Sequence, residues 1–214
     1  MNVWLAVLLT ALEAYLLGSL CFGIIFTRLF IHKDIREFGS GSAGMTNVLR
    51  AVGAVPGALT GLGDFVKGAA AIILGRFIFS SAFLDPYLGG YLAALCALLG
   101  HLFPLYFGFK GGKGVMITAG ILLVLNPWLL LIVGLVFIAV FAASRIVSLS
   151  SISAAASLPL ANLALAFMTD SEKLFSTLFA LVMGALVIYM HRSNIRRLRA
   201  GEEKKIVIKK KESE

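Results

Sequence analysis

Charged side chains are scarce in this sequence. Only 14% of its 214 residues are Asp, Glu, Lys or Arg, whereas 59% are apolar. Soluble domains carry roughly 25% charged and about 45–50% apolar residues, so the composition excludes an ordinary soluble fold. Apolar stretches long enough to cross a bilayer recur along the whole chain. We therefore predict an all-α polytopic membrane protein.

Cysteine is scarce as well. Cys21 and Cys96 both lie inside apolar stretches without neighbouring metal-binding residues. This excludes a disulfide framework and a zinc site, and we expect neither a metal nor another cofactor. The first apolar stretch, Val3–Phe30, lacks the basic start of a signal peptide and is far longer than its apolar core. It is predicted to be a retained transmembrane helix.

Hydropathy and helix-breaking residues divide the chain into seven apolar segments. They are 3–27, 53–78, 88–107, 115–125, 128–143, 150–168 and 174–190. The fourth segment would make only about 17 Å of helix, which is short of a hydrocarbon core of about 30 Å. It could instead fuse with the fifth segment across Asn126-Pro127, which would leave six spans.

The basic residues decide between seven and six spans. With seven segments and the N-terminus outside, sixteen of the 19 Lys and Arg residues fall on one side of the membrane. Six spans would place Arg145 and the basic C-terminal cluster outside, against the enrichment of Lys and Arg in cytoplasmic loops. We predict seven transmembrane helices or part-helices with a cytoplasmic C-terminus. Residues 1–198 would form one membrane domain, and 199–214 a basic tail that need not be ordered.

This topology also explains the net charge of +8. In a soluble protein such a charge would suggest nucleic acid, but here it lies at membrane borders, so no nucleic-acid partner is expected. We expect the tail around Lys204–Lys211 to contact anionic lipid. Residues 31–38 are predicted to form an amphipathic helix on the membrane surface. The sequence has no internal repeat, which weighs against common secondary transporters.

Polar residues inside the apolar segments need a separate explanation. The second segment carries a face of small residues around one acid, at positions Gly57, Gly61, Asp64, Gly68, Ala71 and Gly75. An intramembrane acid is costly unless it is paired, and Lys67 lies three residues after Asp64. The two residues form either a structural ion pair or part of a binding site. His101, just before a glycine-rich loop, is likewise either structural or functional.

That loop runs from Phe109 to Gly114 and leads into the fourth segment. Its glycines would let backbone N–H groups close on an anion, while Lys113 and the helix N-terminus add positive charge. It is not a nucleotide-binding Walker A loop, which would need glycine at Phe107 and a hydroxyl residue at Gly114. The loop is therefore either a phosphate site or a flexible basic connection.

Three other polar clusters fall on the same predicted side of the membrane. Residues 39–50 contain Gly-x-Gly-x-x-Gly, but no strand precedes it, so a dinucleotide site is excluded. Their hydroxyls, amide and arginine are suited to a phosphate or polyol, unless the loop merely turns the chain. The remaining clusters are 144–151 and 191–197. A shared site would explain why all four lie on one side.

In order and spacing, these motifs resemble those of the bacterial acyl-phosphate:glycerol-3-phosphate acyltransferases, a seven-helix membrane family. The resemblance covers nearly the whole chain. It rests on Asp34-Ile35-Arg36 with 39–50, Asp64-x-x-Lys67-Gly68, Gly100-His101-x-Phe103-Pro104 through Gly111–Val115, and His191-x-x-Asn194-Ile195 with Arg197-Leu198. Two positions depart from the family pattern: Ser42 replaces an asparagine, and Met116-Ile117 replace an alanine-threonine pair.

The resemblance implies transfer of a fatty acyl group from acyl phosphate to the 1-hydroxyl of glycerol 3-phosphate, giving lysophosphatidic acid and phosphate. By this resemblance Lys113, Arg50, His101 and Ser40 would be catalytic, and Gly111, Gly112 and Gly114 would hold the acyl phosphate. Substrate would also meet Thr46, Asn47, Ser151, His191, Asn194, Asp64 and Lys67. The expected location is the cell inner membrane, with acyl phosphate, glycerol 3-phosphate and membrane lipid as partners and the active site facing the cytoplasm.

The chemistry expected from such residues is direct transfer. Acyl phosphate is already activated, so positioning and charge neutralisation suffice. None of His32, His101 and His191 has an aspartate five residues later, as the His-x4-Asp acyltransferases do. The hydroxyl proton would go to a substrate phosphate or to His101. A transporter for a phosphorylated molecule and a non-catalytic scaffold are the competing interpretations.

Overall fold

The computed structural model describes residues 1–169 and 173–206, and these residues form helices and no strand. The chain divides into two compact units, Met1–Leu130 and Leu131–Glu214. The helices are α1 (Val3–Gly18), α2 (Phe22–Ile31), the 3-10 turn η1 (Ile35–Glu37), α3 (Met45–Ala51), α4 (Ala54–Ser81), α5 (Pro86–Leu102), the 3-10 turn η2 (Leu105–Phe107), α6 (Val115–Leu125), α7 (Pro127–Ser144), α8 (Val147–Thr169), α9 (Lys173–Met190) and α10 (Arg192–Arg199). The all-α prediction is confirmed for the described residues.

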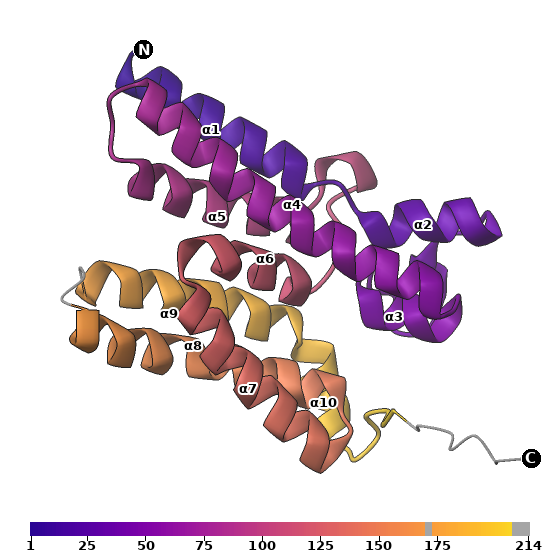
Figure 1. The fold of residues 1–214 in the computed structure, drawn as a ribbon. Coiled ribbons are helices and arrows are strands. Elements are labelled where there is room, and N and C mark those ends of the chain that lie inside the picture. The colour runs from indigo at the N-terminus through magenta and orange to yellow at the C-terminus, as the bar shows by residue number, and fades with distance from the viewer. Residues whose placement is uncertain (170–172, 207–214) are drawn as a thin grey trace, which may run out of the picture. The chain divides into compact units, whose positions relative to one another are not determined.

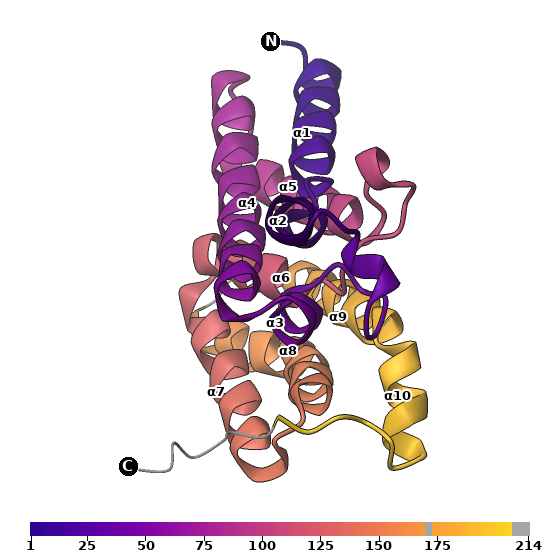
Figure 2. The same ribbon diagram turned by 90° about the vertical axis from the view of Figure 1, so that its right-hand side faces the viewer.

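The first unit is organised around α4. This helix packs against α1, α5 and α6, and its N-terminal half also meets α2 and α3 (Figures 1 and 2). The predicted small face is buried: Gly68 lies against the backbone of Ile117 in α6, and Gly75 against Gly89 in α5. Because these positions carry no side chain, the helix backbones approach closely. The predicted small face of α4 is thus confirmed.

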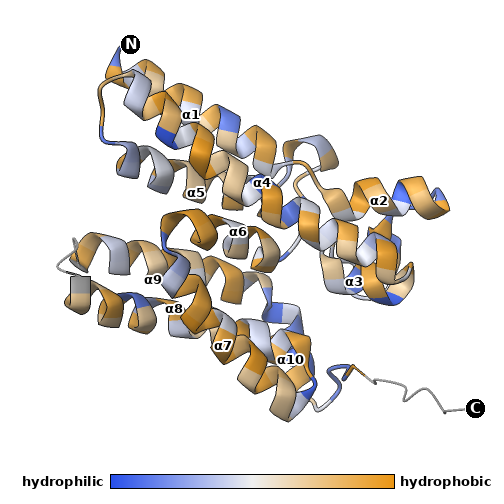
Figure 3. Cartoon of the chain, in the orientation of Figure 1, coloured by the Kyte–Doolittle hydropathy of each residue, from blue (hydrophilic) through white to orange (hydrophobic). Residues whose placement is uncertain are grey.

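The second unit contains the last helices of the chain. Within it α8 packs against α9, and Asn162 Nδ2 donates to Ser176 Oγ at 3.0 Å between them. A bend of 61° separates α9 from the short basic helix α10. Figure 3 shows the hydrophilic residues of this unit gathered at α10 and the segment after it, while α7 to α9 are mostly hydrophobic.

Several helices are long and apolar enough to cross a membrane. They are Val3–Ile31, Pro86–Phe107, Pro127–Ser144 and Val147–Met168, with a further span if α9 and α10 count as one broken helix. The short fourth segment is also present as α6, which ends at Leu125 before α7 begins at Pro127. Asn126 between them is extended, because proline disfavours a helical residue before it. The alternative of one fused helix is wrong.

The region around the first loop differs from the prediction in detail. The first span, Val3–Ile31, is present, but it is interrupted between Gly18 and Phe22, so that it consists of the two helices α1 and α2. Residues 31–38 do not form an amphipathic helix: α2 ends where His32 is left-handed, and only the single turn η1 follows. The reason is Asp34, whose Oδ1 accepts the backbone N–H of Arg36 at 3.0 Å and thereby caps this turn.

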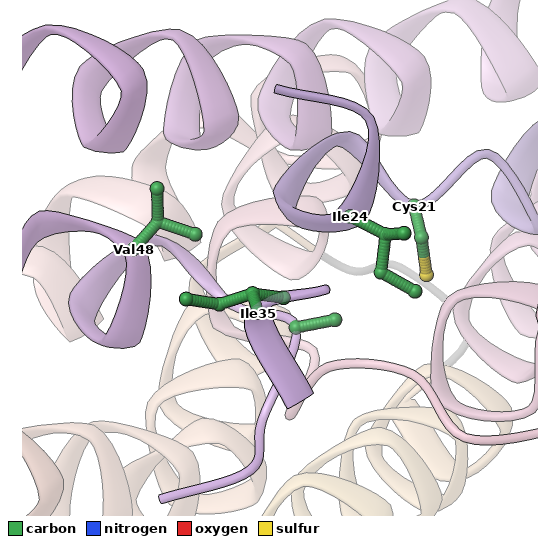
Figure 4. Close-up of a cluster of buried hydrophobic side chains, with 5 residues drawn as sticks. Cys21, Ile24, Ile35 and Val48 are labelled. Carbon is green, nitrogen blue, oxygen red and sulfur yellow. The ribbon is translucent and has the colours of Figure 1, made fainter. Parts of the chain in front are cut away.

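A small apolar cluster holds this region on α2. Cys21, Ile24, Ile35, Ala43 and Val48 are at most 1% exposed and gather between α2, η1 and α3 (Figure 4). The loop before α3 lies so close to α2 that a Cβ atom on Gly23 would meet the carbonyl oxygen of Ala43. The first glycine-rich loop is therefore fixed by buried contacts rather than merely turning the chain.

Candidate active site

The loop after η2 folds back onto the C-terminal end of α5. The N–H of Gly111 donates to Leu102 O and that of Gly112 to His101 O, both at 3.2 Å. These two N–H groups therefore satisfy carbonyls that α5 leaves unpaired at its end. That Gly111 and Gly112 contact the acyl phosphate stays a prediction. A Cβ atom on Gly111 would lie 2.0 Å from His101 O, so this close approach requires glycine.

The start of α6 is the second group of backbone N–H donors in this loop. Gly114 precedes the helix with φ 88°, a conformation that favours glycine. The first backbone bond of α6 runs from Thr118 N–H to Gly114 O, so the N–H groups before Thr118 point out of the helix end. Lys113 lies beside them and is half-buried. Together they offer positive charge to a phosphoryl group.

The first glycine-rich loop is organised by Asn47. This side chain is 7% exposed. Its Oδ1 accepts the N–H of Ser40 at 3.1 Å, and its Nδ2 lies 2.9 Å from Phe38 O and 3.0 Å from Ser42 O. Both ends of the amide are thus used inside the loop, so Asn47 shapes the loop around the exposed Ser40.

The short helix α3 carries two more of the predicted residues. Thr46 is half-buried in its first turn, and Arg50 is exposed in its last. Residues four apart share one face of a helix, so Thr46 and Arg50 lie on the same side of α3. This face offers a hydroxyl and a guanidinium group.

The structure brings the two glycine-rich loops together within the first unit. The N–H of Ala43 donates to Gly111 O at 3.4 Å. The Arg36 guanidinium donates to Phe107 O at 2.6 Å and to Asp34 at 2.9 and 3.0 Å. Burial would raise the pKa of Asp34, but its hydrogen bonds from Arg36 and Arg28 outweigh this and hold the pKa below its usual range. Asp34 therefore stays ionised and anchors both loops.

Behind the second loop lies a buried polar group formed by Asp64, Lys67 and His101. Each of these side chains is at most 3% exposed, and Lys67 Nζ lies 2.8 Å from Asp64 Oδ1 and 3.0 Å from His101 Nδ1. The predicted ion pair of Asp64 and Lys67 is present, and His101 joins it. In the described part of the chain, no three His, Cys, Asp or Glu residues form a metal site.

The second unit has a polar cluster of its own, centred on Glu203. Its carboxylate is 5% exposed and accepts from Ser148 Oγ and Asn194 Nδ2, each at 2.8 Å, and from Arg197 Nε at 2.7 Å. The sequence analysis missed Glu203, although an acid within a run of basic residues was a visible signal. The predicted basic tail, which need not have been ordered, forms hydrogen bonds as far as Ile206, whose N–H donates to Arg145 O. Residues 207–214, including Lys209, Lys210 and Lys211, lie outside the described part.

The other predicted residues of this unit offer hydrogen-bond acceptors. His191 is 3% exposed, and its Nδ1 lies 2.8 Å from Val187 O, which places the ring proton on Nδ1 when the ring is neutral. Ser151 Oγ donates to Val147 O at 2.9 Å. Because Glu203 holds the amide nitrogen of Asn194, the buried Oδ1 of Asn194 faces away from it and has no hydrogen-bond partner among the described residues. An acceptor oxygen of this kind suits a substrate hydroxyl.

The Glu203 cluster leads to a prediction about stability. Replacing Glu203 with alanine would leave Ser148, Asn194 and Arg197 without their acceptor, at a cost of about 3 kcal/mol of unfolding free energy. We expect the Tm of the purified protein to fall by roughly 6–12 °C. Glu202→Ala, at the exposed neighbouring position, is the matched control and should change Tm little.

The same cluster predicts a pH dependence. Burial would raise the pKa of Glu203, but hydrogen bonds from Asn194, Arg197 and Ser148 lower it overall. Its stabilising effect is therefore complete above the ordinary glutamate pKa of about 4.3 and is lost as the pH falls through the lower folded-state value. In thermal melts from pH 7 to pH 3, the Tm difference between wild type and Glu203→Gln should shrink at acid pH. A constant difference would contradict this role.

Comparison with known proteins agrees with this arrangement. Residues 8–201 match the family described as glycerol-3-phosphate acyltransferase. The chain belongs to the glycerol-3-phosphate acyltransferase family. A member from Clostridioides difficile strain 630 is 41% identical over 203 residues, covering 95% of this chain and 97% of that protein. A second, from Syntrophomonas wolfei, is 43% identical over 195 residues, covering 91% and 94%.

Solved structures give the same result for this acyltransferase. The glycerol 3-phosphate form of PlsY, an integral membrane glycerol 3-phosphate acyltransferase, has a TM-score of 0.80 at 36% identity and covers 94% of this chain and 96% of its own. The lysophosphatidic acid form of PlsY has a TM-score of 0.78 at 37% identity. With its apolar helices, the chain is therefore a multi-pass membrane enzyme of phospholipid synthesis.

Proposed function

We propose that this acyltransferase takes its acyl group from acyl phosphate and transfers it to the 1-hydroxyl of sn-glycerol 3-phosphate, the first step of phospholipid synthesis. The observation that carries the proposal is the hydrogen bond between Ala43 and Gly111, which joins a hydroxyl-rich loop to a lysine-bearing one. The reaction needs two anionic groups beside each other, and these loops supply donors for both. Family membership and the glycerol 3-phosphate form of PlsY support the acceptor.

The donor side of the reaction is assigned to the start of α6. Lys113 and the N–H groups at this helix end would bind the phosphoryl group of acyl phosphate. The oxygen of the 1-hydroxyl attacks the acyl carbonyl carbon, and the carbon–oxygen bond to the phosphoryl group breaks. Phosphate leaves with that electron pair, and the hydroxyl proton ends on the released phosphate. Lys113 stabilises the charge that develops on the leaving group.

The phosphate of the acceptor is assigned to the first unit. There Ser40 and the face of α3 with Thr46 and Arg50 would bind the phosphate of glycerol 3-phosphate, because arginine forms bidentate bonds to phosphate. Taken by itself, the second unit offers hydrogen-bond acceptors on Asn194, His191 and Ser151, and the resemblance to the family proposes these residues as substrate contacts. Gly111 and Gly112 contribute by allowing the loop to lie against α5.

The proposed topology has seven transmembrane helices or part-helices, with the N-terminus outside and the C-terminus in the cytoplasm. The basic loops and α10 support this orientation through the enrichment of Lys and Arg on the cytoplasmic side. Both glycine-rich loops then face the cytoplasm, where glycerol 3-phosphate is dissolved. The acyl chain of the donor would stay in the lipid of the cell inner membrane.

A direct assay tests the proposed donor. The purified protein in lipid would be given glycerol 3-phosphate with either palmitoyl phosphate or palmitoyl-CoA, and lysophosphatidic acid would be measured. We expect product from palmitoyl phosphate alone. Product from palmitoyl-CoA but not from palmitoyl phosphate would show that the donor is wrong. No product from either donor, in protein that melts cooperatively, would contradict the proposed reaction.

A further inference from the structure

Lys67 makes three polar contacts deep within the first unit. Its ammonium group lies 2.8 Å from Asp64 Oδ1 and 3.0 Å from His101 Nδ1, and it donates to the carbonyl oxygen of Leu20. That carbonyl lies at the break between α1 and α2, where the backbone needs a partner from outside the helix. An ammonium group has only donors, so Lys67 donates to Leu20 O and to His101 Nδ1. Its contact with Asp64 Oδ1 is an ion pair, because that oxygen accepts no hydrogen bond among the described residues.

The contact with Lys67 determines how His101 is protonated. Because the ammonium group can only donate, His101 Nδ1 must be the acceptor and carries no proton. In the neutral ring the proton then lies on Nε2. The neutral ring also fits the charges of the group, since Asp64 and Lys67 already balance each other and all three side chains are at most 3% exposed.

The protonated nitrogen faces the phosphate-binding loop. A Cβ atom on Gly112 would lie 2.2 Å from His101 Nε2 and 2.7 Å from Cε1, so the ring edge lies directly against this glycine. Gly112 is also bonded through its N–H to His101 O. The residue that follows it is Lys113, which is assigned to the phosphoryl group. The imidazole therefore presents an N–H group to the loop.

We propose that Asp64 and Lys67 are positioning residues that hold His101 as the Nε2–H tautomer, and that this N–H is a fixed hydrogen-bond donor to the phosphoryl group at the loop. This assignment rests on the proposed acyl-phosphate reaction and deepens it. His101 transfers no proton, because its Nε2 is already protonated and its Nδ1 is occupied by Lys67. Asp64 and Lys67 act on the substrate only through the ring.

The tautomer can be measured without any activity assay. Full-length protein labelled with ¹⁵N-histidine would be studied by NMR, with the His101 signals identified by their loss in His101→Gln. We expect Nδ1 to be unprotonated and Nε2 protonated. In Lys67→Met, Asp64 Oδ1, 3.5 Å from Nδ1, becomes the nearest charged partner, and the proton should move to Nδ1. A proton on Nδ1 in the wild type would overturn the proposal.

Variants of His101 show whether this residue acts as a hydrogen-bond donor or as a proton-accepting base. The amide N–H of glutamine reaches about as far as the ring Nε2–H, whereas that of asparagine is one methylene shorter. We expect His101→Gln to keep kcat within about 10-fold of wild type, and His101→Asn and His101→Phe to lose about 100-fold, the size expected for one transition-state donor. The KM for glycerol 3-phosphate should change little in all three. His32→Asn, in the exposed turn after α2, serves as the control.

The results of the NMR and kinetic experiments on His101 can be told apart from a failure of the proposed acyl-phosphate reaction. An inactive wild type would refute the reaction itself, while the NMR result would still test the tautomer. A proton acceptor at this position would make His101→Gln as inactive as His101→Phe, which would overturn the donor role. A purely structural role would lower the Tm of all three variants while leaving the kcat of His101→Phe near that of wild type, and this too would refute the proposal.

Discussion

Replacing Lys113 with alanine is expected to lower kcat/KM for palmitoyl phosphate about 1,000-fold. The reason is the position of Lys113 at the N-terminal end of α6, where its charge adds to the outward-pointing N–H groups of the helix. Charge builds on the leaving phosphate during transfer, and a half-buried ammonium group stabilises it more than water does. Lysophosphatidic acid formation from purified protein is the measurement.

The matched control for this prediction is Lys110→Ala. Lys110 belongs to the same loop and carries the same charge, but it is exposed to solvent. We expect Lys110→Ala to keep most of the activity, and both variants to keep the Tm of wild type within a few degrees. Equal losses in the two variants would mean that only the overall charge of the loop matters. Near wild-type turnover by Lys113→Ala would show that Lys113 has no role in the reaction.

The second large effect is expected from adding a single methyl group to the loop, in Gly112→Ala. The new Cβ atom would lie 2.2 Å from His101 Nε2, which is too close for any real contact. The ring cannot move aside easily, since it is 3% exposed and its Nδ1 is held by Lys67. Either the loop leaves the end of α5 or the ring loses its partner. The first change displaces Lys113 and the second displaces the His101 donor, so we expect at least a 100-fold loss of kcat/KM in either case.

Gly134→Ala in α7 is the control for this substitution. A Cβ atom at Gly134 meets no heavy atom within 4 Å, and alanine favours a helix more than glycine does. We expect its activity and Tm to match or exceed those of wild type. If Gly112→Ala had wild-type activity and an unchanged Tm, the close packing of the loop against His101 would be wrong.

The sequence determined that the chain consists of apolar helices because hydropathy is a local property. The scarcity of charge, the seven apolar segments and the small face of α4 were all visible in residues near one another in the chain. Asn126-Pro127 even separated α6 from α7 by a local rule, although the alternative of a fused helix had to be kept open. The family could be named from the sequence for a similar reason, since its motifs recur in fixed order.

Hydrogen bonds and ion pairs of particular side chains, some local and some between distant residues, decided the rest. Residues 31–38 have helical spacing, but Asp34 binds Arg36 and Arg28, so a capped turn replaces the helix. The N–H groups of Gly111 and Gly112 bind α5 because the loop folds back onto that helix. Glu203 is acidic in a basic tail, and only the fold places it on Ser148, 55 residues earlier.

In the glycine-rich basic loops, too, the sequence determined some properties and the tertiary structure decided others. Their composition established by itself that they are suited to phosphate, because glycine, hydroxyl groups and positive charge are chemical properties of the residues. Which groups remain available for a substrate depended on what the backbone and neighbouring side chains already bind. The tertiary structure uses Asn47 and two glycine N–H groups internally and places the His101 ring against Gly112 of the loop. Packing decides which donors bond within the protein and which remain for a substrate, and no local sequence pattern shows this.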